Sequence, residues 1–178
     1  MFKSAKYAMN PVSSPENSIL ILDRFNGIEG YPIELAEWNL YRNKESGLMN
    51  LWICLRAGKA IFQQEDTQYL NAQPNWELNL VDANISESSI KAGFNATIPE
   101  CYDESKDGWI TVMYFCDHQG TDRNSIEIVE VDGSRVRFRL RGDTTDVNYY
   151  NGSKPETKLS VDTWFERNHN GIRSMSWC

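Results

Sequence analysis

The sequence has few of the residues and motifs on which most enzyme active sites depend. It holds only two histidines in 178 residues, which excludes His-rich metal sites and many general-base schemes. No HExxH zinc motif, GxSxG nucleophile turn or glycine-rich phosphate loop occurs. Two carboxylates could still pair in space to form a hydrolytic dyad, because such pairing cannot be read from a sequence. A non-enzymatic function is therefore favoured over an enzymatic one.

Long apolar runs and paired cysteines are also missing. The most apolar stretches, residues 19–22 and 110–116, are too short to cross a bilayer, and residues 1–18 lack a signal-peptide core. The four cysteines are widely spaced with no CxxC, as expected of buried thiols in a reducing compartment. We therefore expect a soluble, cytoplasmic protein with no membrane partner, an expectation that a leader cleaved earlier would overturn.

Positive charge is in deficit. The formal net charge is -7 and the sequence pI is about 4.9. A chain of this balance is repelled by phosphate backbones, so nucleic acid is disfavoured as a partner.

Aromatic residues, in contrast, are abundant at 12% of the chain. Aromatic and β-branched residues suit pleated, half-buried surfaces, so this content favours β structure. The length fits a single domain, residues 1–178, with an irregular lead-in at 1–18 and a polar tail at 166–178.

Alternating segments predict the strands. Residues 48–56 place Met49, Leu51, Ile53 and Leu55 on one face. Residues 109–116 are apolar on both faces, which predicts a central buried strand. Residues 125–141 predict a hairpin with a three-residue loop at 131–133, and a last hairpin is expected to join 144–150 to 157–165. With hairpin spacing throughout, we expect a mainly antiparallel β-sandwich or flattened barrel of roughly eight to ten strands with little helix.

One loop resembles the opening of a calcium site. Asp103, Ser105 and Asp107 stand at alternate positions before Gly108, as oxygen ligands do in a calcium-binding loop. The twelfth position is Tyr114 where an EF-hand requires a glutamate, so an EF-hand itself is excluded. An ordinary solvated turn is the stronger reading, because turns favour Asp, Ser and Gly for backbone reasons. We therefore expect no cofactor, and Ca²⁺ at this loop is the alternative that the sequence leaves open.

A second cluster follows the 109–116 segment. Cys116, Asp117, His118 and Asp122 lie within seven residues and could form a nucleophile–base site or part of a zinc site. Against this, Cys116 continues an apolar strand and is more simply a core thiol. These four residues are the catalytic candidates of a small hydrolase or isomerase, the competing functional hypothesis.

The third candidate is a row of arginines. Arg135, Arg137, Arg139 and Arg141 alternate with apolar residues, so they share one strand face and could bind anionic groups. A solvated outer face balanced by neighbours such as Glu127 is the plainer reading. Exposed aromatic residues such as Trp52 could instead stack on sugars, although tryptophan in a β domain more often fills the core.

The sequence thus favours a non-enzymatic binding module that recognises a protein partner or a small anionic ligand. The ligand candidates are the four arginines and Trp52. A calcium-dependent or glycan-binding β domain is a further alternative.

Overall fold

The computed structural model describes residues 18–105 and 107–169, and almost all regular structure in them is β. Most of the predicted lead-in (1–17) and of the polar tail (170–178) lies outside the described residues. The strands are β1 (Ile19–Arg24), β2 (Gly27–Arg42), β3 (Met49–Ala57), β4 (Asn75–Ala83), β5 (Asn95–Ile98), β6 (Tyr102–Asp103), β7 (Gly108–Trp109), β8 (Thr111–Tyr114), β9 (His118–Asp132), β10 (Arg135–Thr144) and β11 (Thr157–Arg167). One 3-10 turn, η1 (Glu87–Ser89), is the helical element of the described part, in which no helix has the length and apolarity to cross a membrane.

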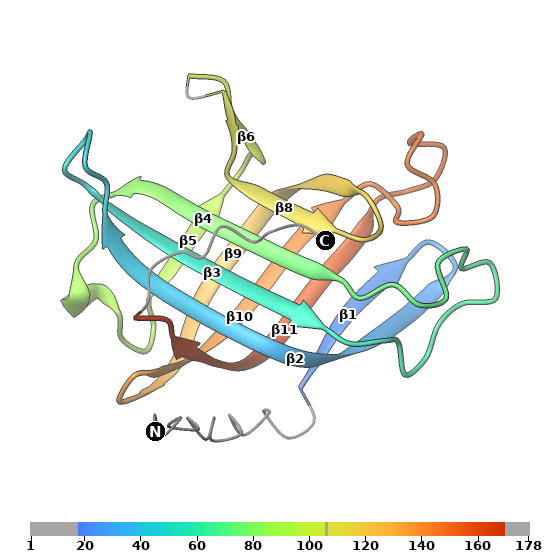
Figure 1. The fold of residues 1–178 in the computed structure, drawn as a ribbon, viewed down its shortest axis with the longest axis horizontal. Helices are drawn as coiled ribbons and strands as arrows, with labels where there is room; N and C mark the ends of the chain where they lie inside the picture. The colour runs from blue at the N-terminus through green and yellow to red at the C-terminus, as the bar shows by residue number, and fades with distance from the viewer. Residues whose placement is uncertain (1–17, 106, 170–178) are drawn as a thin grey trace, which may run out of the picture.

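The strand pairings close on themselves (Figure 1). Antiparallel pairs run from β1 through β2, β3, β4, β8, β9, β10 and β11, and β11 pairs with β1 again. The remaining strand of this sheet, β5, pairs with β9 along the same edge as β8 but further along the strand. The mainly antiparallel β fold predicted from the sequence is confirmed, and of the two expected forms the closed circuit matches the flattened barrel.

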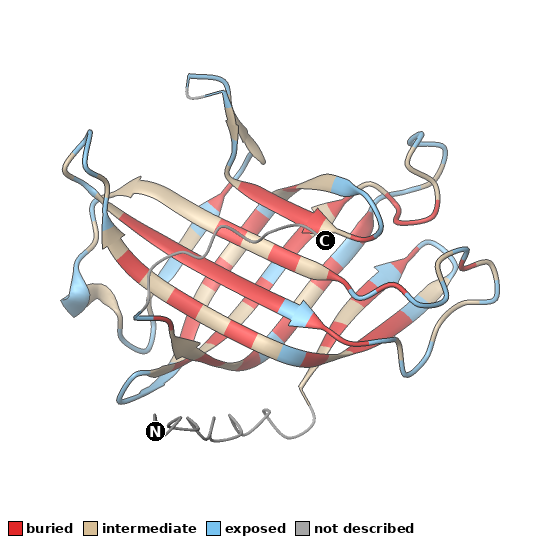
Figure 2. Cartoon of the chain, in the orientation of Figure 1, coloured by how far each residue is buried: buried red, intermediate tan, exposed pale blue. Residues whose placement is uncertain are grey.

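Large apolar side chains from all nine strands of the main sheet fill the interior. Buried residues alternate with less buried ones along most of these strands (Figure 2). Leu51, Ile53 and Leu55 face inward from β3, as the alternation predicted. Burying such a side chain contributes about 1.5–3 kcal/mol. The largest fully buried side chains are Trp76, Tyr31, Phe115, Phe138, Phe165, Leu20, Leu22, Leu51, Ile53, Leu55, Leu78 and Met113.

Two predicted elements differ from the structure. The expected strand 109–116 is broken at Ile110: Trp109 is exposed in the separate β6–β7 ribbon, and β8 begins at Thr111. Residues 145–150, predicted as part of a strand, instead begin a loop that runs to residue 156, because buried Asp146 turns to Arg24 and accepts a hydrogen bond from Asn148 N. In addition, β11 continues to Arg167, two residues into the predicted tail.

Four connections meet at one end of the closed sheet. They are the β1–β2 turn at residues 25–26, the β3–β4 connection at 58–74, the β8–β9 turn at 115–117 and the β10–β11 connection at 145–156 (Figure 1). We call this the loop end. Binding residues concentrate on loops that a rigid scaffold positions, so the loop end is the first place to look for a site.

Candidate functional site

A buried arginine organises the loop end. Arg24 is the last residue of β1, and its side chain is fully buried. Its guanidinium donates two hydrogen bonds of 3.0 Å to Asp146, from Nε to Oδ2 and from Nη2 to Oδ1. It also donates to Glu29 Oε1 at 2.8 Å and to both carboxylate oxygens of Asp66, at 3.0 and 3.1 Å. One cation therefore joins β2 to the 58–74 and 145–156 connections.

The acidic partners of Arg24 have further hydrogen bonds of their own. Tyr31 donates to Glu29 Oε2 at 2.7 Å, and Thr157 donates to Asp146 Oδ2 at 3.0 Å. Burial alone would lower the pKa of Arg24, but its bonds to Asp146, Asp66 and Glu29 outweigh burial and raise it. Arg24 is therefore always protonated, and its hydrogen bonds hold β2 and the two connections in a fixed arrangement.

The loop end also exposes apolar side chains. Five large hydrophobic residues on the β1–β2 turn, the start of β2 and the 58–74 connection are between 40% and 67% exposed. We call these the loop-end apolar surface: Phe25, Ile28, Ile61, Phe62 and Leu70. The other large hydrophobics with comparable exposure in the described part are Leu48, Trp109 and Val131, which lie on three separate segments. Exposed apolar side chains gathered on neighbouring loops are a mark of interaction sites.

The 58–74 connection is fixed to β2 by its backbone. Gly30 N donates to Phe62 O at 3.0 Å, and Ile61 N donates to Gly30 O at 2.9 Å. The Phe62 ring lies directly over Gly30, where a Cβ atom would be 2.2 Å from Phe62 Cζ. Gln64 Nε2 also donates to Ile28 O at 2.9 Å. The exposed rings and aliphatic groups are therefore held in place by the scaffold.

A second exposed cluster stands beside this surface. The rings of Phe25 and Tyr149 meet edge to face at 5.7 Å. Lys154 Nζ lies 5.1 Å from the Phe25 ring centre and 5.2 Å from that of Tyr149. This contact joins the β1–β2 turn to the 145–156 connection and places a positive charge at the edge of the apolar surface.

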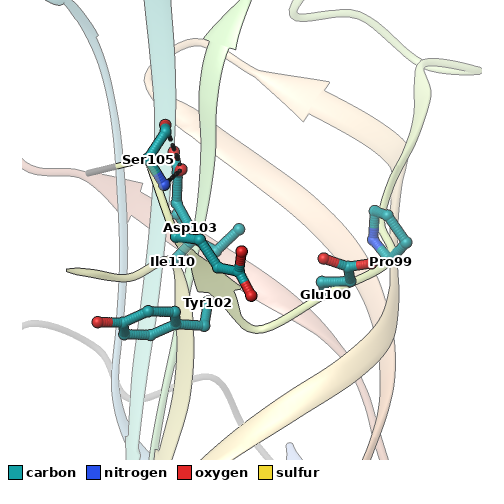
Figure 3. A pocket seen from close by; sticks show the side chains of 7 residues that line it. Pro99, Glu100, Tyr102, Asp103, Ser105 and Ile110 are labelled. Atoms are coloured by element: carbon teal, nitrogen blue, oxygen red, sulfur yellow. Dashed lines mark hydrogen bonds between the residues drawn. The ribbon is translucent and has the colours of Figure 1, made fainter. Parts of the chain in front are cut away.

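Two of the three predicted calcium residues line an open hollow of about 360 Å³ beside the β6–β7 ribbon (Figure 3). Asp103 and Ser105 line the hollow, but Asp103 Oδ1 accepts bonds from Ser105 N at 3.0 Å and from Ser105 Oγ at 2.6 Å. Asp107 accepts from the hydroxyl of Tyr102. In the described residues, no group of three or more His, Cys, Asp or Glu side chains is arranged to hold a metal ion. The full lining is Pro99, Glu100, Tyr102, Asp103, Glu104, Ser105 and Ile110.

The structure does not bring the four catalytic candidates together. Cys116, Asp117 and His118 lie exposed on the β8–β9 turn, and burial raises the pKa of the Cys116 thiol, so little thiolate is present. Asp117 accepts from the backbone N–H of His118 at 2.8 Å. Asp122 instead accepts from Cys101 N at 2.9 Å. The four residues therefore form no nucleophile–base arrangement here.

The arginine row lies on one face of β10, as the alternation predicted, and it is largely neutralised. Arg137 pairs with Asp162 at 2.6 Å, and Arg139 pairs with both Glu127 at 2.8 Å and Asp162 at 3.0 Å. Burial alone would raise the pKa of Asp162. The hydrogen bonds from Arg137 and Arg139 lower it by more, so the pKa lies below its usual value.

The two ends of the row have different surroundings. Arg135 pairs with Asp132 and lies over the Trp164 ring, whereas Arg141 is exposed between Ser125 and Ser160. Trp52, the fifth ligand candidate, is 2% exposed, so its ring offers no free face.

Sequence reasoning missed the residues that organise the loop end. Arg24 lies between Asp23 and Phe25 after the apolar run 19–22, and residues 57–75 are mostly polar. The one available signal was Ile61 and Phe62, an apolar pair inside that polar stretch.

Comparisons with protein-family models, with curated proteins and with solved structures found no match to this chain.

Proposed function

We propose that this chain is a non-enzymatic binding module that engages a protein partner through the loop-end apolar surface. The observation that carries the proposal is the arrangement of that surface. Five exposed hydrophobic side chains lie on segments that backbone hydrogen bonds and an ion-pair network centred on the buried Arg24 connect to the scaffold. A preorganised surface loses little conformational entropy when it binds, which favours affinity.

The other candidates have less support. Most of the arginine row is already paired with carboxylates, so an anionic ligand would have to compete with them. The hydrolase or isomerase reading lacks a converged set of side chains at Cys116 and His118. A cytoplasmic setting remains part of the proposal, supported by the free thiols of Cys54, Cys101 and Cys116.

A displayed library of random 12-residue peptides provides the test. Peptides selected on the wild-type protein are measured by fluorescence anisotropy against the double variant Ile61→Ser/Leu70→Ser. We expect binding to weaken at least tenfold, because residues at the centre of an interface carry most of its energy. The matched control is Leu48→Ser/Val131→Ser, which removes two exposed hydrophobics from other segments. Equal binding by the wild type and the loop-end variant, or a selection that yields no binders, would overturn the proposal.

A further inference from the structure

The charges around the loop-end apolar surface are unevenly satisfied. Glu29 and Asp146 are fully buried against Arg24, and Asp66 accepts from both Arg24 and Asn26. All three carboxylates are therefore already bonded to Arg24: Glu29 and Asp146 inside the protein and Asp66 at its surface. A basic partner segment would find none of the three free.

Lys154 is in the opposite situation. Its ammonium group is held against the Phe25 and Tyr149 rings, and within the described residues no carboxylate lies within 4.0 Å of it. Lys59, exposed two positions before Ile61, likewise has no ion pair in the described part of the chain. An ammonium group placed on aromatic faces keeps its hydrogen-bonding capacity for an incoming acceptor.

From the position of Lys154 on the Phe25 and Tyr149 rings we infer that the partner segment is acidic as well as apolar, and that Lys154 recognises its carboxylate. Large apolar side chains of the segment pack on Ile61, Phe62 and Leu70, while an Asp or Glu next to them meets Lys154. Glu65 is exposed on the same connection and repels an acidic segment. The carboxylate of the partner segment therefore has to contact the Lys154 ammonium group directly, beside the Phe25 and Tyr149 rings. This inference rests on the proposed function and names the partner class for the same surface.

Three peptide sublibraries test it on the full chain. Their apolar positions vary among Leu, Ile, Phe and Trp, and their polar positions are fixed as Asp, Lys or Ser. We expect the Asp sublibrary to give the tightest binders. Lys154→Gln should weaken these binders about two- to fivefold, the range for one partly exposed charge pair. Lys154→Arg should retain binding, and Lys91→Gln, an exposed lysine on the 84–94 connection, serves as the matched control.

The outcomes separate the two claims. If the Lys or Ser peptides bind as tightly as the Asp peptides, and Ile61→Ser/Leu70→Ser still abolishes binding, the acidic partner class is wrong and the proposed function stands. If Asp peptides bind but Lys154→Gln leaves their affinity unchanged, Lys154 is not the recognition residue and the inference fails. If no sublibrary yields a binder, both the inference and the proposed function are wrong.

Discussion

Arg24 and Asp146 meet through two parallel hydrogen bonds of 3.0 Å, although 122 positions separate them in the chain. Because the same guanidinium also holds Glu29 and Asp66, the geometry of the loop end depends on one buried cation. The network anchors the connections that carry the exposed hydrophobic side chains. The stability of the fold and the geometry of the loop-end apolar surface therefore both depend on this residue.

Replacing Arg24 with methionine should destabilise the protein strongly. The side chain keeps much of its volume, but Glu29 and Asp146 lose the charge that compensates their burial. Breaking a buried ion pair in this way costs about 3–5 kcal/mol, as urea unfolding would measure. The control is Arg56→Met, whose exposed pair with Glu34 spans 4.0 Å and should contribute about 1 kcal/mol or less. Equal stability of the two variants would contradict the assigned role of Arg24.

Asp66 should give a pH-dependent contribution to stability. Its bond to Arg24 lowers the pKa of Asp66 below the usual 3.8, so the ionised form stabilises the folded state. That stabilisation is present above pH 3.8 and is lost as the pH falls through the lowered pKa. The difference in unfolding free energy between wild type and Asp66→Asn should therefore be largest at neutral pH and shrink below about pH 4. A difference that stays constant or grows on acidification would count against the pairing.

The β9–β10 hairpin illustrates what the sequence pattern can predict. The pattern placed Ile126 and Ile128 on the same face as Phe138, and these side chains are all buried inside. The predicted three-residue loop at 131–133 would pair Ile128 with Val136, but in the structure Ile128 pairs with Phe138. The turn is the two-residue Gly133–Ser134, with Gly133 at a φ of +60°, and a register shift follows at residues 137–138. Burial fixes the face of each residue, but the changed turn and the bulge together move the register by two without changing any face.

The Arg24 network illustrates what the pattern could not predict. Its charged members come from β1, β2 and two connections, and nothing local distinguishes Asp66 or Asp146 from the acidic residues of ordinary loops. Their role arises from closure of the sheet, which brings the four connections to one end. A single sequence carries no signal for contacts of this range, so the candidate surface emerged only with the fold.

The contact of Gly30 with Phe62 predicts a specific coupling. A methyl group at Gly30 would lie inside the Phe62 ring, so Gly30→Ala should displace the ring and destabilise the protein by about 1–3 kcal/mol. In a Phe62→Ala background the methyl group has room, and the same substitution should cost much less. A double-mutant cycle of urea unfolding measures this coupling. Additive effects would show that Phe62 does not fix the position of the connection.

Calcium should leave the stability of this protein unchanged. Asp103 Oδ1 is already occupied by Ser105, and Asp107 accepts from Tyr102, so these oxygens serve the turn beside the β6–β7 ribbon. A ligand of the folded state present at about 100 times its dissociation constant would add about 2.7 kcal/mol. Thermal unfolding of chelator-treated protein with and without about 1 mM free Ca²⁺ would reveal such a gain. Asp103→Ala should lower the unfolding temperature slightly and equally in both conditions, because it removes the hydrogen bonds to Ser105. An upward shift with Ca²⁺ in the wild type that Asp103→Ala abolishes would instead establish a metal site in the hollow.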